Sequence, residues 1–402
     1  MAGLTPLASS AFRWVWCSSV AIALATGMER TASAWLALQV GGGALVGLML
    51  AARMLPPLVF GLAAGTMADR IDRRRQLMAV AVAALPLVAA FGWFAASGRA
   101  EVWLLLLITF GLGCVTVFDQ PARQTLAMDT VPPAVASNAI ALNALATRLF
   151  TAVGALIAGA VIATVDLASC YVLVAGACVL GAGMAFGIRA PRASGFHSHP
   201  PFRQALGAAA RLVLDVPAVR TLFIVGVTCE VLAFSFLTAV PVVARDVLDA
   251  GAEGLGVLNA AVSVGGTASV LLLSVLPGRI PREPVLGWVF VIFGASLVGV
   301  ASTRELALAS AVLAVTGACA AAFDVLEQNL IQLAVPEDQR GRAVGVWLLG
   351  LGSAPVGHLE MGALVTALGA PSGLLINGAL VLASAALLLA RAPAYRSKRY
   401  RS

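Results

Sequence analysis

Two long apolar runs on either side of a short arginine-rich segment constrain this chain more than any other feature. The runs cover residues 45–64 and 77–96, and the segment between them is Gly65–Arg75. Each run is about 20 residues long, the length that a helix needs to cross ~30 Å of hydrocarbon. A connection this short predicts a tight antiparallel pair of membrane-spanning helices. Basic residues are enriched in cytoplasmic loops, so the turn is expected in the cytoplasm. Its arginines are Arg70, Arg73, Arg74 and Arg75.

The composition excludes a soluble domain. Of 402 residues 60% are hydrophobic and 11% are charged, which is too little charge to cover a soluble surface of this size. The net charge of +7 comes from arginines in loops and in the tail, so it indicates contact with anionic lipid rather than with nucleic acid. The six cysteines lie in apolar runs without C-x-x-C spacing. We therefore expect an all-α, polytopic protein of the lipid bilayer, with no metal, cofactor or nucleic-acid partner.

The apolar runs predict twelve membrane-spanning helices in two six-helix halves. The halves are residues 1–188 and 218–391, joined by a polar cytoplasmic connector, 189–217, and followed by a basic cytoplasmic tail, 392–402. An even number of spans places both termini on one side, and the arginine distribution indicates the cytoplasm. The predicted spans are 12–34, 45–68, 77–96, 102–118, 137–163, 168–188, 219–244, 255–276, 285–301, 306–330, 343–368 and 372–390.

Three short segments recur in matching places of the two halves. Gly47–Ala52 returns as Gly256–Ala261, and Phe118-Asp119 returns as Phe323-Asp324. The hairpin segment 68–73 returns in a degenerate form at 277–282. Such repeats indicate pseudo-symmetric halves with a binding site at their interface, near the middle of the bilayer.

The hairpin resembles the G-x-x-x-D-R-x-G-R-R loop between the second and third helices of the major facilitator superfamily, with Asp72 in place of the second Gly. The segments 118–124, 131–132 and 138–143 look like the branch that holds enterobactin exporters and macrolide efflux proteins. The resemblance covers nearly the whole chain. One departure is Gly154-Ala155, where the antiporter motif on the fifth helix usually has Gly-Pro.

The resemblance implies a cytoplasmic charge network that holds the halves together when the protein opens outward. An acidic residue at a helix N-terminus gains from the helix dipole, and arginine binds carboxylates in bidentate geometry. The alternative is that these charges only determine topology. The implied network contains Gly65, Asp69, Arg70, Arg73, Asp119 and Arg123, with Arg279, Arg282 and Asp324 as its second-half counterpart.

Ionisable residues inside the predicted spans are candidates for proton coupling or substrate binding, because charge in a bilayer is costly. Glu230 lies near the middle of its span with no basic residue close by in sequence, which favours it as the proton carrier. The alternative is a permanently neutral, hydrogen-bonded Glu230. The candidates are Glu29, Arg148, Glu230, His358 and Glu360.

The other four candidates have alternatives of their own. Glu29 is adjacent to Arg30 and could form a local ion pair, although neighbouring residues point about 100° apart on a helix. Arg148 could counter a carboxylate, bind an anionic substrate group or act as a structural partner for Glu29 or Asp119. His358 and Glu360 are two residues apart and point to different faces, so at most one is expected to face a central cavity.

These features predict a secondary active transporter that exports an amphipathic small molecule or drug by alternating access, with protons as the coupling ion. The alternatives are export of a siderophore or other secondary metabolite, or uptake. A membrane enzyme is not expected, since three histidines without metal-ligand spacing offer no catalytic cluster, and a sensor would need a soluble domain. We expect a monomer in the bacterial cytoplasmic membrane.

Replacing Asp69 with Asn is expected to leave the protein in the membrane but to cripple transport, because the motif places this carboxylate in the charge network. The measurement is the transport rate in cells, normalised to the amount of protein in the membrane. An unchanged rate at normal expression would reject the gating role.

Overall fold

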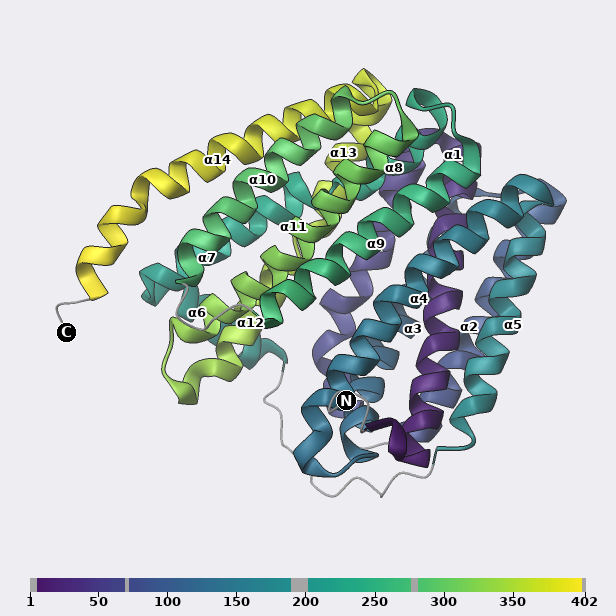
Figure 1. The fold of residues 1–402 in the computed structure, drawn as a ribbon, viewed down its shortest axis with the longest axis horizontal. Coiled ribbons are helices and arrows are strands. Elements are labelled where there is room, and N and C mark those ends of the chain that lie inside the picture. Colours follow the sequence, from purple (N-terminus) through teal and green to yellow (C-terminus); the bar gives the residue numbers. More distant parts are fainter. Residues whose placement is uncertain (1–5, 69–71, 189–201, 276–280, 400–402) are drawn as a thin grey trace.

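The chain is helical throughout the part that the structure describes, a computed structural model covering residues 6–68, 72–188, 202–275 and 281–399 (Figure 1). Helices in these residues are connected by short turns, and they contain no strand. Many large apolar side chains face outward, among them Val172 and Trp93, which are 70% and 69% exposed. Such a surface is unsuited to water and suits lipid. The predicted all-α, polytopic class is confirmed.

The first helix, α1 (Ser10–Ala68), contains two membrane crossings. Its backbone is non-helical at Gly41 and Gly42, and Gly42 has a positive φ of 62°. Glycine adopts this conformation readily because it has no β-carbon. Glu29 and Arg53 lie equally far from Gly41 along the chain, and their side chains form an ion pair of 2.8 Å. The two arms of α1 are therefore antiparallel, and the ion pair joins them.

Among the described residues, eleven helices are long and apolar enough to span a membrane, and the break in α1 brings the crossings to twelve, as predicted. The seventh crossing runs through four consecutive elements, and the eleventh through two. Beyond α1, the crossings are α2 (Arg73–Ser97), α3 (Val102–Asp129), α4 (Ala136–Thr164), α5 (Leu167–Ala185), α7 (Pro217–Thr228) with the π-helical turn η3 (Cys229–Ala233), α8 (Phe236–Val242) and the second π-helical turn η4 (Val243–Val247), then α9 (Gly251–Val275), α10 (Arg282–Ser302), α11 (Leu306–Leu333), α12 (Arg340–Leu351) with α13 (Ala354–Leu368), and α14 (Ala370–Arg399).

The segment predicted as a polar connector contains a helix, α6 (Phe202–Asp215). Ala209 and Leu212 of α6 are buried in a cluster that includes Val335 and Val346. The sequence prediction missed α6 because apolar residues occupy only one face of it, so the segment as a whole reads as polar. The predicted tail, 392–402, begins within α14, which continues to Arg399.

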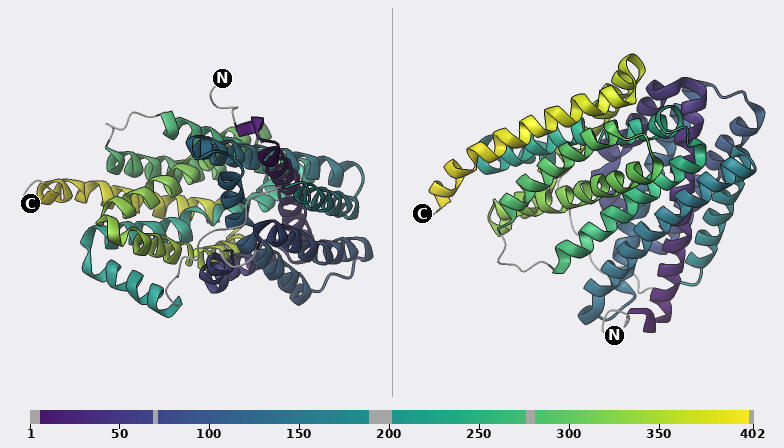
Figure 2. Two further views of the ribbon diagram at one scale, coloured as in Figure 1. Left: turned by 90° about the horizontal axis from the view of Figure 1, so that it is seen from below. Right: turned by 45° about the horizontal axis from the view of Figure 1, so that its top comes forward.

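The early and late crossings meet through paired glycines. Gly47 of α1 packs against Gly362 of α13, and Gly256 of α9 packs against Gly159 of α4. Gly47 and Gly256 are equivalent residues of the sequence repeat, so the two contacts are related by the same internal symmetry. In Figure 1, α1–α5 and α7–α14 approach each other near the labels of α1, α8 and α13 and diverge toward the ends that carry the termini. Figure 2 shows the same divergence from another side.

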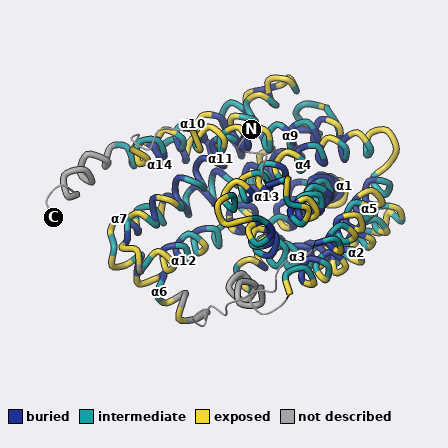
Figure 3. The backbone as a smooth tube through the Cα atoms, turned by 60° about the horizontal axis from the view of Figure 1, so that its bottom comes forward, coloured by how far each residue is buried: buried dark blue, intermediate teal, exposed yellow. Residues whose placement is uncertain are grey.

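Burial follows this arrangement. We call α1–α5 the first set of helices and α7–α14 the second set. Figure 3 shows buried residues inside each set and exposed residues along the outer surfaces of helices such as α2, α5 and α6. A continuous core of buried apolar residues runs from α1 through α8 to α14. Several polar and charged side chains are buried within this apolar core.

Gly256→Val is expected to destabilise the protein by about 1–3 kcal/mol, because overpacking a close contact forces backbone shifts. A β-carbon at Gly256 would lie 2.6 Å from the carbonyl oxygen of Ala155 and 3.0 Å from Cα of Gly159. Gly183→Val is the matched control, because a β-carbon there meets nothing within 4 Å. Thermal unfolding in detergent measures both variants. Equal melting temperatures would show that the glycine contact is not needed.

Candidate functional site

A buried ion pair links the two arms of α1. A guanidinium nitrogen of Arg53 lies 2.8 Å and 3.0 Å from the two carboxylate oxygens of Glu29. The side chains of Arg53 and Glu29 are only 9% and 5% exposed. Sequence analysis had considered Arg30 as a local partner of Glu29, but the residue that pairs with Glu29 is Arg53, on the other arm.

A second ion pair, between Asp119 and Arg123 of α3, lies closer to the end of α1 that carries the N-terminus. Nε of Arg123 donates to Asp119 at 2.6 Å, and another nitrogen of Arg123 donates to Oγ of Ser18 at 3.1 Å. The structure thus brings together Asp119 and Arg123, both members of the implied charge network. Arg73, a third member, contacts Asp129 instead, which sequence analysis did not single out.

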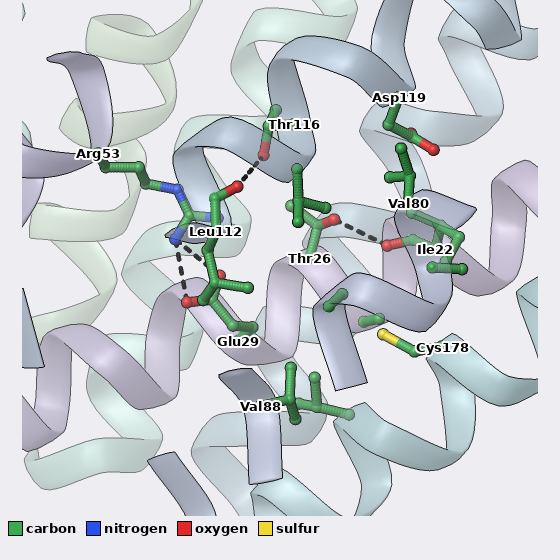
Figure 4. A pocket seen from close by; sticks show the side chains of 15 residues that line it. Ile22, Thr26, Glu29, Arg53, Val80, Val88, Leu112, Thr116, Asp119 and Cys178 are labelled. Atoms are coloured by element: carbon green, nitrogen blue, oxygen red, sulfur yellow. Dashed lines mark hydrogen bonds and ion pairs between the residues drawn. The ribbon is translucent and has the colours of Figure 1, made fainter. Parts of the chain in front are cut away.

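A cavity of about 90 Å³ extends between the two ion pairs (Figure 4). Its walls include Glu29 and Asp119, with Thr26 and Thr116 among the apolar residues that complete the lining. One buried water needs roughly 10–15 Å³, so this mostly apolar cavity has room for water beside its few polar groups. Water in this cavity can therefore hydrate Glu29 and Asp119, which are already paired with arginines.

The late crossings contain three carboxylates without such partners. Glu230 and Glu327 are 7% and 4% exposed, and Oδ1 of Asp324 is buried without a hydrogen-bond partner. The three lie close enough to interact electrostatically. Glu327 packs so closely on α7 that a β-carbon at Gly226 would collide with its carboxylate. Within the described ranges, none of the three forms an ion pair with a basic residue.

Arg148 reaches this acidic cluster from the other set of helices. It is exposed on α4, and its guanidinium approaches Gly266 of α9, 3.5 Å from where a β-carbon would lie. It interacts electrostatically with Asp324 but makes no ion pair within the described part of the chain. Glu29 and Asp119, which the sequence analysis had named as structural partners for Arg148, pair with other arginines.

Glu230 is carried by an unusual backbone turn. In the π-helical turn η3, the N–H of Phe234 donates to the carbonyl of Cys229 at 2.9 Å, five residues back. Gly357 of α13 packs against the carbonyls of Glu230 and Val231 on this turn. Single π-turns inside helices occur frequently at functional sites. The local geometry therefore marks Glu230 independently of its charge.

His358 and Glu360 contact different neighbouring helices, as their spacing implied. Nδ1 of the buried His358 lies 3.0 Å from the hydroxyl of Thr238 on α8. The half-buried Glu360 accepts a hydrogen bond of 3.0 Å from Nδ2 of Asn377 on α14. Neither residue belongs to the cluster around Glu230.

The second-half counterpart of the charge network is arranged differently from the prediction. Arg282 donates to the side-chain oxygen of Asn329 at 3.1 Å rather than to Asp324. Asp324 instead lies within the acidic cluster. Gly65 belongs to α1, while Asp69, Arg70 and Arg279 lie outside the described residues, so their roles remain predictions.

Sequence analysis missed Arg53 and Asn377, which contact candidate residues, and Glu327, which interacts electrostatically with Glu230 and Asp324. Arg53 interrupts a long apolar run, and its mirror position to Glu29 about Gly41 is a signal that could have identified it. Glu327 lies one helical turn after Asp324, inside the predicted span 306–330. The rule that singles out ionisable residues in predicted spans therefore applies to it as well. Asn377 gives no sequence signal, because only packing brings it to Glu360. No group of three or more His, Cys, Asp or Glu in the described ranges is arranged to hold a metal ion.

Comparison with known proteins matches this chain to a transmembrane protein family and to an efflux pump. A family model described as "Transmembrane secretion effector" matches residues 1–400. The multidrug efflux pump Tap of Mycolicibacterium fortuitum is 28% identical over 363 residues, which cover 85% of this chain and 86% of Tap.

Solved structures show the same fold. The nucleoside transporter NupG matches with a TM-score of 0.72 at 12% identity, covering 95% of this chain and 98% of that one. A bacterial homolog of the human lysosomal transporter Spinster, solved inward-facing and unoccupied, has a TM-score of 0.67 at 15% identity and covers 94% and 95%.

Arg53→Leu is expected to destabilise the protein by about 3–5 kcal/mol, because it leaves the buried Glu29 carboxylate unpaired. Adding Glu29→Gln to this variant removes the uncompensated charge and is expected to restore most of the loss. Thermal unfolding of both single variants and the double variant gives the coupling energy. Additive losses from the two single changes would contradict a paired role.

Proposed function

The chain belongs to the transmembrane secretion effector family of the major facilitator superfamily, and on this premise we propose that it exports an amphipathic small molecule in exchange for protons. Membership of a transporter family favours transport over catalysis. We place the protein as a monomer in the bacterial cytoplasmic membrane, with both termini in the cytoplasm and two six-helix halves divided near residues 189–217. The arginine-rich hairpin and tail support this orientation.

One contrast between the two sets of helices carries the proton proposal. Among the first set, the buried Glu29 and the partly buried Asp119 each pair with an arginine. Those of the second set, Glu230, Asp324 and Glu327, have no such partner in the described residues. An unpaired carboxylate in a dry environment is stabilised by binding a proton, whereas an arginine partner holds it ionised. The second set is therefore where protons would load.

The sequence repeat sharpens this contrast. Asp119 and Asp324 occupy matching positions, and one helical turn later the first repeat has Arg123 whereas the second has Gln328. Asp119 is therefore neutralised by its own helix, and Asp324 is not. Arg148, reaching across from α4, is the cation that interacts electrostatically with Asp324.

The acidic excess of the cluster favours an amphipathic cation as substrate, since bound positive charge would offset the carboxylates as a proton does. That Tap is described as a multidrug efflux pump supports a drug-like substrate. The second candidate is export of an anionic siderophore-like metabolite. The observation that favours it is Arg148, an exposed guanidinium without an ion-pair partner in the described part of the chain.

Alternating access would follow from relative motion of the two sets of helices. The glycine contacts of Gly47 with Gly362 and Gly159 with Gly256 join them at the ends remote from the termini. We assign the present conformation as open to the cytoplasm. The similarity in fold to the inward-facing Spinster homolog supports this assignment.

Glu230→Gln is expected to preserve substrate binding and passive exchange but to abolish uphill transport driven by a pH gradient. Glutamine has the shape of the protonated acid but cannot release a proton. The measurement is substrate accumulation in proteoliposomes with and without a pH gradient. Glu337→Gln, at an exposed carboxylate outside the spans, is the matched control. Accumulation by Glu230→Gln equal to that of the parent would move the coupling site elsewhere.

A further inference from the structure

The first arm of α1 ends against the second set of helices. Its helical backbone stops at Gly41, so Leu38 is among the last residues of that arm. The last four carbonyls of a helix have no regular partner four residues further on. The carbonyl of Leu38 accepts a hydrogen bond of 3.0 Å from Nη1 of Arg245, which belongs to the second set. A side chain from one set therefore caps a helix of the other.

Two features hold Arg245 in this orientation. Its Nε and Nη2 donate to the two carboxylate oxygens of Asp246 at 2.6 Å and 3.1 Å, which leaves Nη1 for the carbonyl of Leu38. Arg245 also lies in the π-helical turn η4, where the N–H of Leu248 donates to the carbonyl of Val243 at 3.0 Å, five residues back. Such turns occur frequently at functional sites, and the proposed function gives η4 no role.

Further contacts between the sets surround this cap, at the ends remote from the termini. Gly43, directly after the break in α1, packs on the second set, because a β-carbon there would lie 2.6 Å from Cγ1 of Val365 and 3.5 Å from Cγ2 of Val242. Nδ2 of Asn259 on α9 donates to the hydroxyl of Thr31 on α1 at 3.2 Å. We call these ends the outer ends of the helices.

We propose that Arg245 and the carbonyl of Leu38 form an outer latch that holds the two sets together at their outer ends. The C-terminal end of a helix carries a partial negative charge, so a cation there is stabilising. Both this attraction and the hydrogen bond are lost when the outer ends separate. Because a contact made in only one conformation shifts the population toward it, the latch favours the conformation open to the cytoplasm.

Only the second set can form this latch. Leu36 lies as far before Gly47 as Arg245 lies before Gly256, so Leu36 is the equivalent residue of the first repeat. Leucine has no side-chain donor and no charge. The sequence repeat therefore does not supply a matching contact, and the loss of Arg245 alone removes the latch.

The latch rests on the proposed function, because that proposal assigns the present conformation as open to the cytoplasm. Arg245 acts as a positioning residue, since it sets the balance between conformations and need not touch the substrate. Its side chain is 39% exposed, so its replacement does not open a cavity in the core. The conformational balance can be measured without any transport.

The test is amide hydrogen exchange along the full-length protein in lipid nanodiscs. Opening to the outside exposes the outer ends of the helices and closes the opposite ends. Arg245→Ala is therefore expected to speed exchange in residues 155–164 of α4 and to slow it in residues 133–140 and 337–345. The ratio of these rates is expected to change about two- to fivefold, the range that a cation at a helix C-terminus provides.

Arg304→Ala is the matched control. Nη1 of Arg304 donates to the carbonyls of Ala301 and Thr303 at 3.2 Å and 2.9 Å, so this arginine caps the end of α10 within its own set. Its loss is expected to leave exchange at both ends of α4 unchanged. Arg245→Lys keeps the cation beside the end of α1 and is expected to restore part of the parental exchange.

A second variant tests the neighbouring contact between the sets. Asn259→Leu installs the residue that the first repeat has at the equivalent position, Leu50, and removes the hydrogen bond to Thr31. It is expected to shift exchange in the same direction as Arg245→Ala.

Three outcomes would overturn the latch. Faster exchange confined to residues 36–46 in Arg245→Ala would show that Arg245 only prevents fraying of α1. Exchange in Arg245→Ala equal to that of the parent would show that the contact does not bias the conformation. Equal responses of Arg245→Ala and Arg304→Ala would show that the effect does not depend on a contact between the sets.

Transport of ethidium, an amphipathic cation, in proteoliposomes separates the latch from the proposed function. If Arg245→Ala changes exchange in opposite directions at the two ends but a pH gradient drives no ethidium transport, the latch stands and the proposed export fails. If ethidium transport is driven by the pH gradient but exchange in Arg245→Ala is unchanged, the proposed export stands and the latch is rejected.

Discussion

An ionised group deep in a membrane protein must be paired, hydrated or neutralised, because its solvation by water is lost and the loss amounts to several kcal/mol per ion. The ionisable residues of the early and late crossings meet this constraint in different ways. In the early crossings Arg53 and Arg123 pair with Glu29 and Asp119, and a cavity adds room for water beside them. In the late crossings Glu230, Asp324 and Glu327 have no arginine partner within the described residues, and we propose that protons neutralise them.

This difference between paired and unpaired carboxylates occurs in a scaffold whose two sets of helices otherwise repeat. Gly47 and Gly256 make equivalent cross-contacts, and Asp119 and Asp324 occupy equivalent positions. The repeat provides two similar sets of helices, and the proposed proton exchange needs only one of them to change its charge. On that proposal, the ion-paired set serves as the fixed wall against which the acidic set loads and releases protons. Gln328, in place of an arginine one turn after Asp324, contributes to this difference.

Backbone irregularities place the charges. The break at Gly41 and Gly42 folds α1 back so that Glu29 and Arg53 meet at one depth. The π-turn η3 displaces Glu230 from regular helical register. Such turns inside helices are frequent at functional sites.

The sequence by itself determined the class, the number of crossings and their approximate bounds, because long apolar runs and arginine-rich loops report directly on lipid and topology. It also singled out Glu230, since an acid in an apolar run is visible without any contact. It could not establish the contact between Glu29 and Arg53, although the mirror position of Arg53 about Gly41 hinted at it, or the contact between Glu360 and Asn377. Those depend on which faces of distant helices meet, and only tertiary packing, set by close glycine contacts and by a non-helical turn, decides that.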